Sequence, residues 1–164
     1  MNIFDNFINK KECKNINEMF LSKNFPWYYS KDQTNSKDTS FMFHIFYREN
    51  QINTQHYDLI EPILNKLNPK KILNIRANLC FKRPSKCGWH VDKWSQDLKH
   101  TTAIYYVNTN NGYTEFKNKK IKCKKNRVVV FDAFKKHRAQ IQTDKDVRMV
   151  INFNYELNYL LLVF

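Results

Sequence analysis

Two histidines, one aspartate and one arginine have the residue types and spacing of a metal site with an anion-binding partner. His90 and Asp92 stand two residues apart in the run Trp-His-Val-Asp. On a β-strand such residues point to the same side, so an imidazole nitrogen and a carboxylate oxygen would face a common point. His137 follows 45 residues after Asp92, and Arg148 follows 11 residues after His137.

Two histidines and one carboxylate can occupy one face of an octahedral metal ion. They leave three adjacent positions open, which is typical of non-haem Fe(II) oxygenases. An arginine nearby could hold a carboxylate through two parallel hydrogen bonds. A 2-oxoacid needs both features, two metal positions for its keto-carboxylate end and a cation for its far end. The plainer alternatives are buried core histidines at positions 90 and 137 and a surface ion pair at Arg148.

From Lys71 to Tyr155 the chain resembles the Fe(II)/2-oxoglutarate-dependent dioxygenase superfamily, and within it the small viral and phage oxygenases related to prolyl 4-hydroxylases. The similarity extends to Asn24–Tyr28, so it covers most of the chain. The other matching segments, in chain order, are 75–79 (IRANL), 90–92 (HVD), 102–108 (TAIYYVN), 111–116 (NGYTEF), 126–131 (NRVVVF), His137 and 148–155 (RMVINFNY).

The resemblance implies that His90, Asp92 and His137 bind iron and that Arg148 binds the distal carboxylate of 2-oxoglutarate. It also implies an enzyme that uses Fe(II), 2-oxoglutarate and O₂, with ascorbate as a candidate reductant. Such an enzyme decarboxylates 2-oxoglutarate to succinate and CO₂ while it hydroxylates a C–H bond of the primary substrate.

The sequence departs from the relatives at one position close to the expected co-substrate site. Relatives often carry a tyrosine where this chain has Cys80, and a thiol is a poor hydrogen-bond donor. Asn78 and Tyr105 are the candidates to replace that tyrosine as 2-oxoglutarate ligands. Arg76 could pair with a carboxylate inside the barrel or point outward, and the sequence does not distinguish the two.

Three kinds of primary substrate follow from the resemblance, in order of preference. Prolyl or other peptidyl hydroxylation comes first and a free amino acid or small metabolite second. AlkB-like oxidation of nucleic acid is third. Two rival classes of protein are a non-catalytic basic barrel that binds nucleic acid and a cupin-like metal isomerase, which would need neither O₂ nor a co-substrate for Arg148 to hold.

Short β runs after Pro69 can position these residues. Strands are predicted near 72–80, 87–92, 101–108, 113–117, 120–123, 127–132, 137–142 and 147–155, separated by polar turns. By resemblance the fold class is mainly β (α+β), a double-stranded β-helix of the jelly-roll or cupin type flanked by N-terminal helices. In that fold the second and seventh barrel strands pair, which would bring His90 and Asp92 beside His137.

The first 70 residues are expected to support this barrel within one domain, 1–164, whose core is 71–156. Helices are predicted over 9–21 and 55–67, the second with a late start or kink at Pro62, and a strand over 41–47. The aromatic stretch 25–29 and the polar segment 30–40 could form a lid over the substrate entrance, or serve as core and linker.

Composition limits the other possibilities. The net charge is +13, but lysine supplies 22 of the 28 cations, a bias that AT-rich codons would produce without a nucleic-acid partner. We therefore expect a small-molecule or peptide partner, with nucleic acid not favoured and the oligomeric state undetermined. Four scattered cysteines without a CxxC pair and the lack of a long apolar run indicate a cytoplasmic protein, in the host cytoplasm if the gene is viral.

Overall fold

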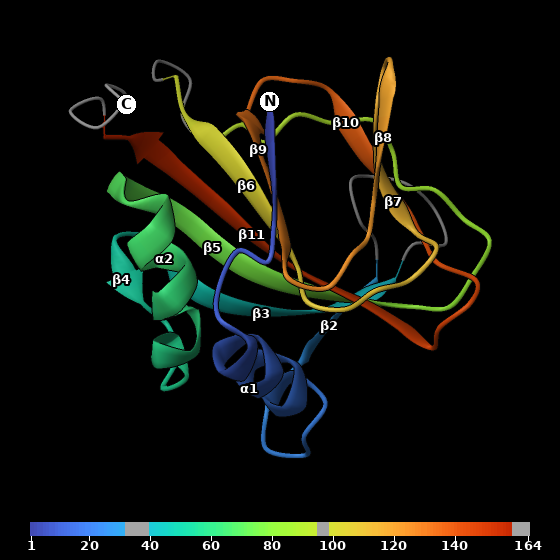
Figure 1. The fold of residues 1–164 in the computed structure, drawn as a ribbon, viewed down its shortest axis with the longest axis horizontal. Helices are drawn as coiled ribbons and strands as arrows, with labels where there is room; N and C mark the ends of the chain where they lie inside the picture. The colour runs from blue at the N-terminus through green and yellow to red at the C-terminus, as the bar shows by residue number, and fades with distance from the viewer. Residues whose placement is uncertain (32–39, 95–98, 159–164) are drawn as a thin grey trace.

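The computed structural model describes residues 1–31, 40–94 and 99–158. Over these residues the protein is mainly β, with two antiparallel sheets and two α-helices (Figure 1). This confirms the predicted double-stranded β-helix class. Within the described residues, no helix is long and apolar enough to cross a membrane.

The large sheet contains strands from both the first and the last part of the chain. Its strand order is β1-β9-β6-β11-β5-β3-β2, with β4 paired to β3. The strands are β1 (Asn2–Asp5), β2 (Tyr28–Ser30), β3 (Phe41–Arg48), β4 (Gln51–Ile52), β5 (Pro69–Phe81), β6 (Thr101–Tyr106), β9 (Arg127–Asp132) and β11 (Val147–Leu157). The first 70 residues thus add strands to the sheet, beyond the helices and single strand that the sequence predicts.

The small sheet has the order β10-β7-β8, formed by β7 (Tyr113–Phe116), β8 (Lys119–Lys122) and β10 (His137–Gln140). The expected strand over 87–92 is wrong as a continuous strand. Only two isolated bridges form there, Lys86 to Gln140 and His90 to His137. The prediction that the segment with His90 lies beside the segment with His137 is nevertheless confirmed.

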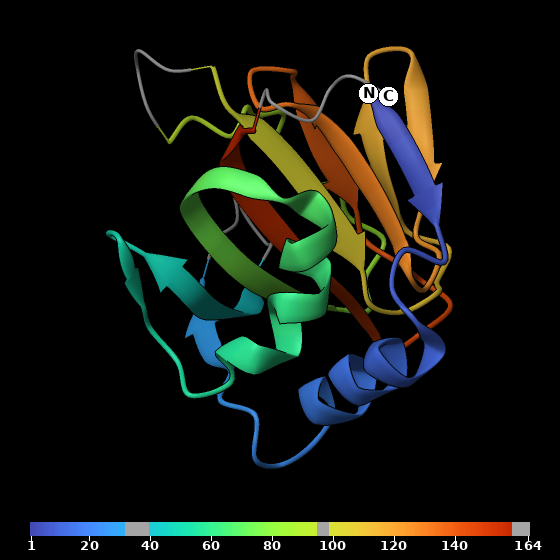
Figure 2. The ribbon, with the colours of Figure 1, turned by 60° about the vertical axis from the view of Figure 1, so that its left-hand side comes forward.

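Two helices pack on one side of the large sheet (Figure 2). Helix α1 (Lys10–Phe20) begins with a capping box between Asn9 and Glu12, and buries Cys13, Ile16 and Phe20. The predicted second helix divides into a 3-10 turn, η1 (Tyr57–Ile60), and α2 (Glu61–Leu67). Pro62 lies in the first turn of α2, where its missing N–H costs no hydrogen bond, and this explains the late start.

Alternation along the central strands separates two hydrophobic cores. On β11, Met149 and Ile151 face the helices, and Val150 faces the small sheet. On β6, Tyr105 belongs to the helix-side core and Tyr106 to the core between the sheets. Because side chains on a strand alternate between faces, the odd-numbered positions named here lie in the core beneath the helices and the even-numbered ones in the core between the sheets.

Candidate metal centre

A histidine-rich cluster lies at the end of the space between the two sheets. One ligand atom each from His90, Asp92 and His137 lies within 4.8 Å of the others. The Nε2 atoms of His90 and His137 are each 3.8 Å from a different oxygen of the Asp92 carboxylate. The structure therefore brings together the three residues that the sequence predicts as metal ligands.

Backbone pairing fixes the relative position of the two histidines. The His90 N–H donates to the His137 carbonyl at 3.0 Å, and the His137 N–H donates back to the His90 carbonyl at 2.9 Å. The Asp92 N–H donates to the Ala133 carbonyl at 2.9 Å. His90 and His137, which are 47 positions apart in the chain, are thus joined by main-chain hydrogen bonds independent of any metal.

The imidazole rings are oriented for coordination through Nε2. Nδ1 of His90 lies 3.1 Å from the Gly88 carbonyl, and Nδ1 of His137 lies 3.0 Å from the Lys135 carbonyl. A carbonyl only accepts, so each Nδ1 carries the proton and each Nε2 keeps its lone pair. Burial lowers the pKa of His137, which favours the neutral form that a metal needs.

Residues that the sequence did not single out hold the carboxylate. The Thr102 hydroxyl donates to Asp92 Oδ2 at 2.8 Å, and the Asn154 amide donates to Thr102 Oγ1 at 2.9 Å. His100 Nε2 lies 2.6 Å from the Asp92 carbonyl oxygen. These partners come from β6, β11 and the segment before β6, so no local motif could have predicted them.

A cavity of about 280 Å³ extends from this cluster between the sheets. Its walls come from β5, β6, β7, β10, β11 and the segment after His90. The lining residues are Arg76, Asn78, His90, Val91, Asp92, Lys93, Trp94, Ile104, Thr114, His137, Ala139, Arg148, Val150 and Asn152. Asn78 and Arg148, two of the predicted co-substrate residues, therefore share one cavity with the metal cluster.

Arg148 lines the cavity and is only 3% exposed. Its Nε donates to the Cys123 sulfur at 3.1 Å, and no carboxylate of the described residues lies within 4.0 Å of its guanidinium. The Arg148 side chain packs close to Gly112, where a side chain would not fit, because an added Cβ would lie 3.2 Å from Arg148 Cδ and 2.9 Å from the Gln140 carbonyl oxygen. A buried cation without a counter-ion is a site for an anionic ligand.

The structure does not bring Tyr105 to the cavity. Its side chain lies on the helix side of the sheet, where the hydroxyl donates to Asn126 Oδ1 at 3.3 Å. The neighbouring Tyr106 faces the cavity side and donates to Thr114 Oγ1 at 2.7 Å. Burial raises the pKa of Tyr106, so it stays protonated. Thr114, which lines the cavity, then retains its own hydroxyl proton for a ligand.

The remaining predicted positions differ in their relation to the cavity. Cys80 is buried without lining it, and burial raises the pKa of its thiol. Asn78 lines it and is 2% exposed, with an Oδ1 that no described group hydrogen-bonds. Of the expected lid, residues 32–39 lie outside the described part of the chain. Tyr28 and Tyr29 are exposed and do not line the cavity.

Comparisons with known proteins identify the fold. No family model matches the sequence, and no curated protein matches it. Among solved structures, a prolyl hydroxylase from Trichoplax adhaerens in complex with a hypoxia-inducible-factor peptide superposes with a TM-score of 0.68 at 12% identity, over 94% of this chain and 82% of that one. The collagen prolyl hydroxylase of Paramecium Bursaria Chlorella virus-1 gives 0.63 at 14% identity, over 96% of both chains.

The same fold is shared with enzymes of different substrates. The alpha-ketoglutarate-dependent epimerase SnoN of nogalamycin biosynthesis matches with a TM-score of 0.69 at 10% identity, over 94% of this chain and 76% of that one. At these identities the likeness shows the architecture, that of the 2OG-Fe(II) oxygenases. The residues of the site have to support the chemistry.

Proposed function

We propose that this chain is an Fe(II)- and 2-oxoglutarate-dependent dioxygenase that hydroxylates a C–H bond. One observation carries the proposal: the His90, Asp92 and His137 cluster and the unpaired, buried Arg148 line a single cavity. A metal site alone would fit many proteins of this fold. The additional cation, Arg148, would bind one carboxylate of a dicarboxylate co-substrate whose other end chelates the metal.

The donor set suits Fe(II). Two neutral imidazole nitrogens and one carboxylate are a facial triad, which leaves the opposite positions free for a chelating co-substrate and O₂. His137 packs against Phe131, with ring centroids 4.9 Å apart, and this apolar contact keeps water from one side of the site. Thr102 holds one Asp92 oxygen, so the carboxylate is oriented before any metal enters.

The far end of the cavity suits the distal carboxylate of 2-oxoglutarate. Arg148 would supply two parallel N–H donors, and the Thr114 hydroxyl, held by Tyr106, would supply a third. Asn78 stands between this end and the metal and can offer its amide to the bound co-substrate. This chain thus replaces the tyrosine that relatives carry at position 80 by Tyr106 and Thr114 on other strands.

The metal, when bound with 2-oxoglutarate and O₂, supplies the oxidative decarboxylation and the hydroxylation of the substrate. The chain itself binds and orients. His90, Asp92 and His137 hold the ion, Arg148 fixes the co-substrate, and the cavity walls exclude water from the reacting atoms. Ascorbate would act only to return oxidised iron to Fe(II).

For the primary substrate we propose a prolyl or other peptidyl residue, or a free amino acid. The prolyl hydroxylases named above have the same fold and nearly the same chain length, which supports a peptide or amino-acid substrate. Oxidation of nucleic acid is a weaker alternative, because the positive charge comes chiefly from lysine. All four cysteines are buried thiols, which supports a reducing compartment, cytoplasmic or, for a viral gene, the host cytoplasm.

An anaerobic titration tests the proposal. Fe(II) followed by 2-oxoglutarate should produce the visible charge-transfer absorption of the chelate, and Asp92→Ala should abolish it while the far-UV circular dichroism stays unchanged. Admission of O₂ with a substrate panel should release succinate. Salt-sensitive binding of DNA or RNA without succinate release would instead identify a non-catalytic nucleic-acid-binding barrel. Turnover without O₂ and 2-oxoglutarate would identify a metal isomerase.

A further inference from the structure

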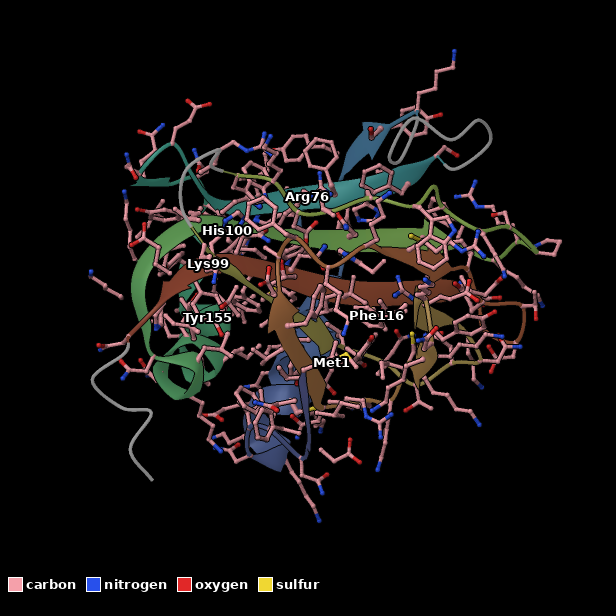
Figure 3. All side chains as sticks on the ribbon, turned by 90° about the horizontal axis from the view of Figure 1, so that it is seen from above. Met1, Arg76, Lys99, His100, Phe116 and Tyr155 are labelled. Carbon is pink, nitrogen blue, oxygen red and sulfur yellow. The ribbon has the colours of Figure 1, made fainter. Side chains whose placement is uncertain are left out.

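Arg76 is a second arginine in the cavity that the proposed co-substrate does not use. It lies on β5 beside β3 (Figure 3) and is partly buried. No carboxylate of the described residues lies within 4.0 Å of it, and its one close aromatic contact is Phe41, whose ring centre is 5.6 Å from Cζ. A structural arginine at such a place normally pairs with an acid.

Strand register places Arg76 near the metal end of the cavity. Arg76 pairs with Asn152 on β11, and Arg148 pairs with Cys80, four residues along β5. At about 3.3 Å per residue the two arginines start roughly 13 Å apart on the same face of the sheet. Asn154, two residues from Asn152, holds the Thr102 hydroxyl that binds Asp92. Arg76 is therefore close to where the metal would act, and remote from Arg148.

The charges of the cavity do not balance without a further anion. Among the described residues of its lining there are three cations, Arg76, Lys93 and Arg148, and one carboxylate, Asp92. Asp92 and the chelating carboxylate of 2-oxoglutarate together offset Fe(II), and the distal carboxylate of 2-oxoglutarate offsets Arg148. Arg76 and Lys93 remain. Lys93 is exposed and screened by water, whereas Arg76 is partly buried. Burial and the nearby Arg48 lower the pKa of Arg76 by more than Asp92 raises it, a cost that a bound anion would relieve.

We infer that Arg76 is a specificity-determining residue that binds a carboxylate of the primary substrate, next to the carbon that reacts. The inference rests on the proposed function for the identity of the reaction. Within it, Arg76 narrows the substrate to a compound with an acidic group close to the oxidised C–H, such as a free amino acid or a peptide that presents a carboxylate there. Asn78, with its unpartnered Oδ1 on the same face, could accept an N–H of the same substrate.

The test follows the Arg76 side chain itself, with acetate as the probe. The full-length, ¹⁵N-labelled protein is loaded with diamagnetic Zn(II) and saturated with 2-oxoglutarate. The arginine Nε–Hε signal of Arg76 is assigned from Arg76→Lys, which keeps the charge and most of the stem. Acetate should then shift this signal in a saturable way, while acetamide and chloride at equal ionic strength should not. Arg127→Gln, a matched change at the ion pair with Asp5 outside the cavity, should retain the response.

Two results would overturn the inference. A signal that acetate moves no more than acetamide does would leave Arg76 a structural residue. A signal that moves when 2-oxoglutarate alone is added, with a tenfold or greater loss of 2-oxoglutarate affinity in Arg76→Gln, would assign the carboxylate to the co-substrate. Failure of the proposed function is distinguishable, because the protein would then not bind 2-oxoglutarate at all, and the acetate titration would still report on Arg76.

Discussion

Replacement of Arg148 by methionine should stabilise the ligand-free protein and destroy its affinity for 2-oxoglutarate. The guanidinium is 3% exposed and has no carboxylate partner among the described residues. Replacing a buried ion pair by apolar side chains of similar volume is often neutral or stabilises a fold by about 1–4 kcal/mol, and removal of a buried charge without a counter-ion should act in the same direction. With about 2 kcal/mol, a chain of this size should melt roughly 4–8 °C higher.

The same change removes the two parallel hydrogen bonds to the distal carboxylate. Losing one partner of a buried charge-assisted contact costs about 2–5 kcal/mol, which corresponds to a roughly 30- to 4,000-fold higher Kd. The wild type should gain about 2.7 kcal/mol from 2-oxoglutarate at one hundred times its Kd, and Arg148→Met should gain almost nothing. The order of stability of the two proteins should therefore reverse when the ligand is added.

Thermal melts with and without Zn(II) and 2-oxoglutarate, combined with the anaerobic Fe(II) titration, measure both effects. Arg127→Gln is the matched control, because Arg127 pairs with Asp5 at 2.7 Å outside the cavity. It should lose up to about 1 kcal/mol of stability and bind 2-oxoglutarate normally. A less stable Arg148→Met protein that still binds 2-oxoglutarate with wild-type affinity would refute the assignment of Arg148 as the residue that binds the distal carboxylate.

Three further predictions address the metal, the two tyrosines and pH. Asp92→Asn should weaken metal binding at least tenfold in a Zn(II) competition titration, with an unchanged circular dichroism spectrum, and undiminished affinity would contradict the proposed ligand set. Tyr106→Phe should weaken 2-oxoglutarate binding by about 1 kcal/mol, whereas Tyr105→Phe should lower only the melting temperature; the opposite pattern would return Tyr105 to the site. Burial lowers the pKa of His44. As the pH falls, the unfolded chain therefore binds a proton at His44 before the folded protein does, and the wild type should lose more stability between pH 8 and pH 5 than His44→Phe. Equal losses of stability in denaturant titrations of the two proteins would exclude His44 as the cause.

Residue types and spacing were sufficient to predict which three residues the fold brings together as the candidate metal site. His90, Asp92, His137 and Arg148 are chemically distinctive, and the resemblance depends on their order and separation. Most strands were also predictable, because hydrophobic alternation is a local property: 127–132 and the start of the strand at 137 agree with the structure. The prediction of a strand over 87–92 was wrong. The cysteine, tryptophan and valine of this segment are typical of a strand, but the segment forms only an isolated bridge, between His90 and His137.

Tertiary structure alone decided which side chains share the cavity. Tyr105 and Tyr106 are adjacent and identical in type, and only the packing of β6 between the helices and the small sheet determines which one faces the site. Thr102 and Asn154 are likewise ordinary strand residues until β6 and β11 pair and join them to Asp92. The register between strands that are distant in the chain depends on the packing of the whole sheet, so it cannot be predicted from any local sequence pattern. The same register placed a second arginine, Arg76, in a cavity whose described lining residues include a single carboxylate.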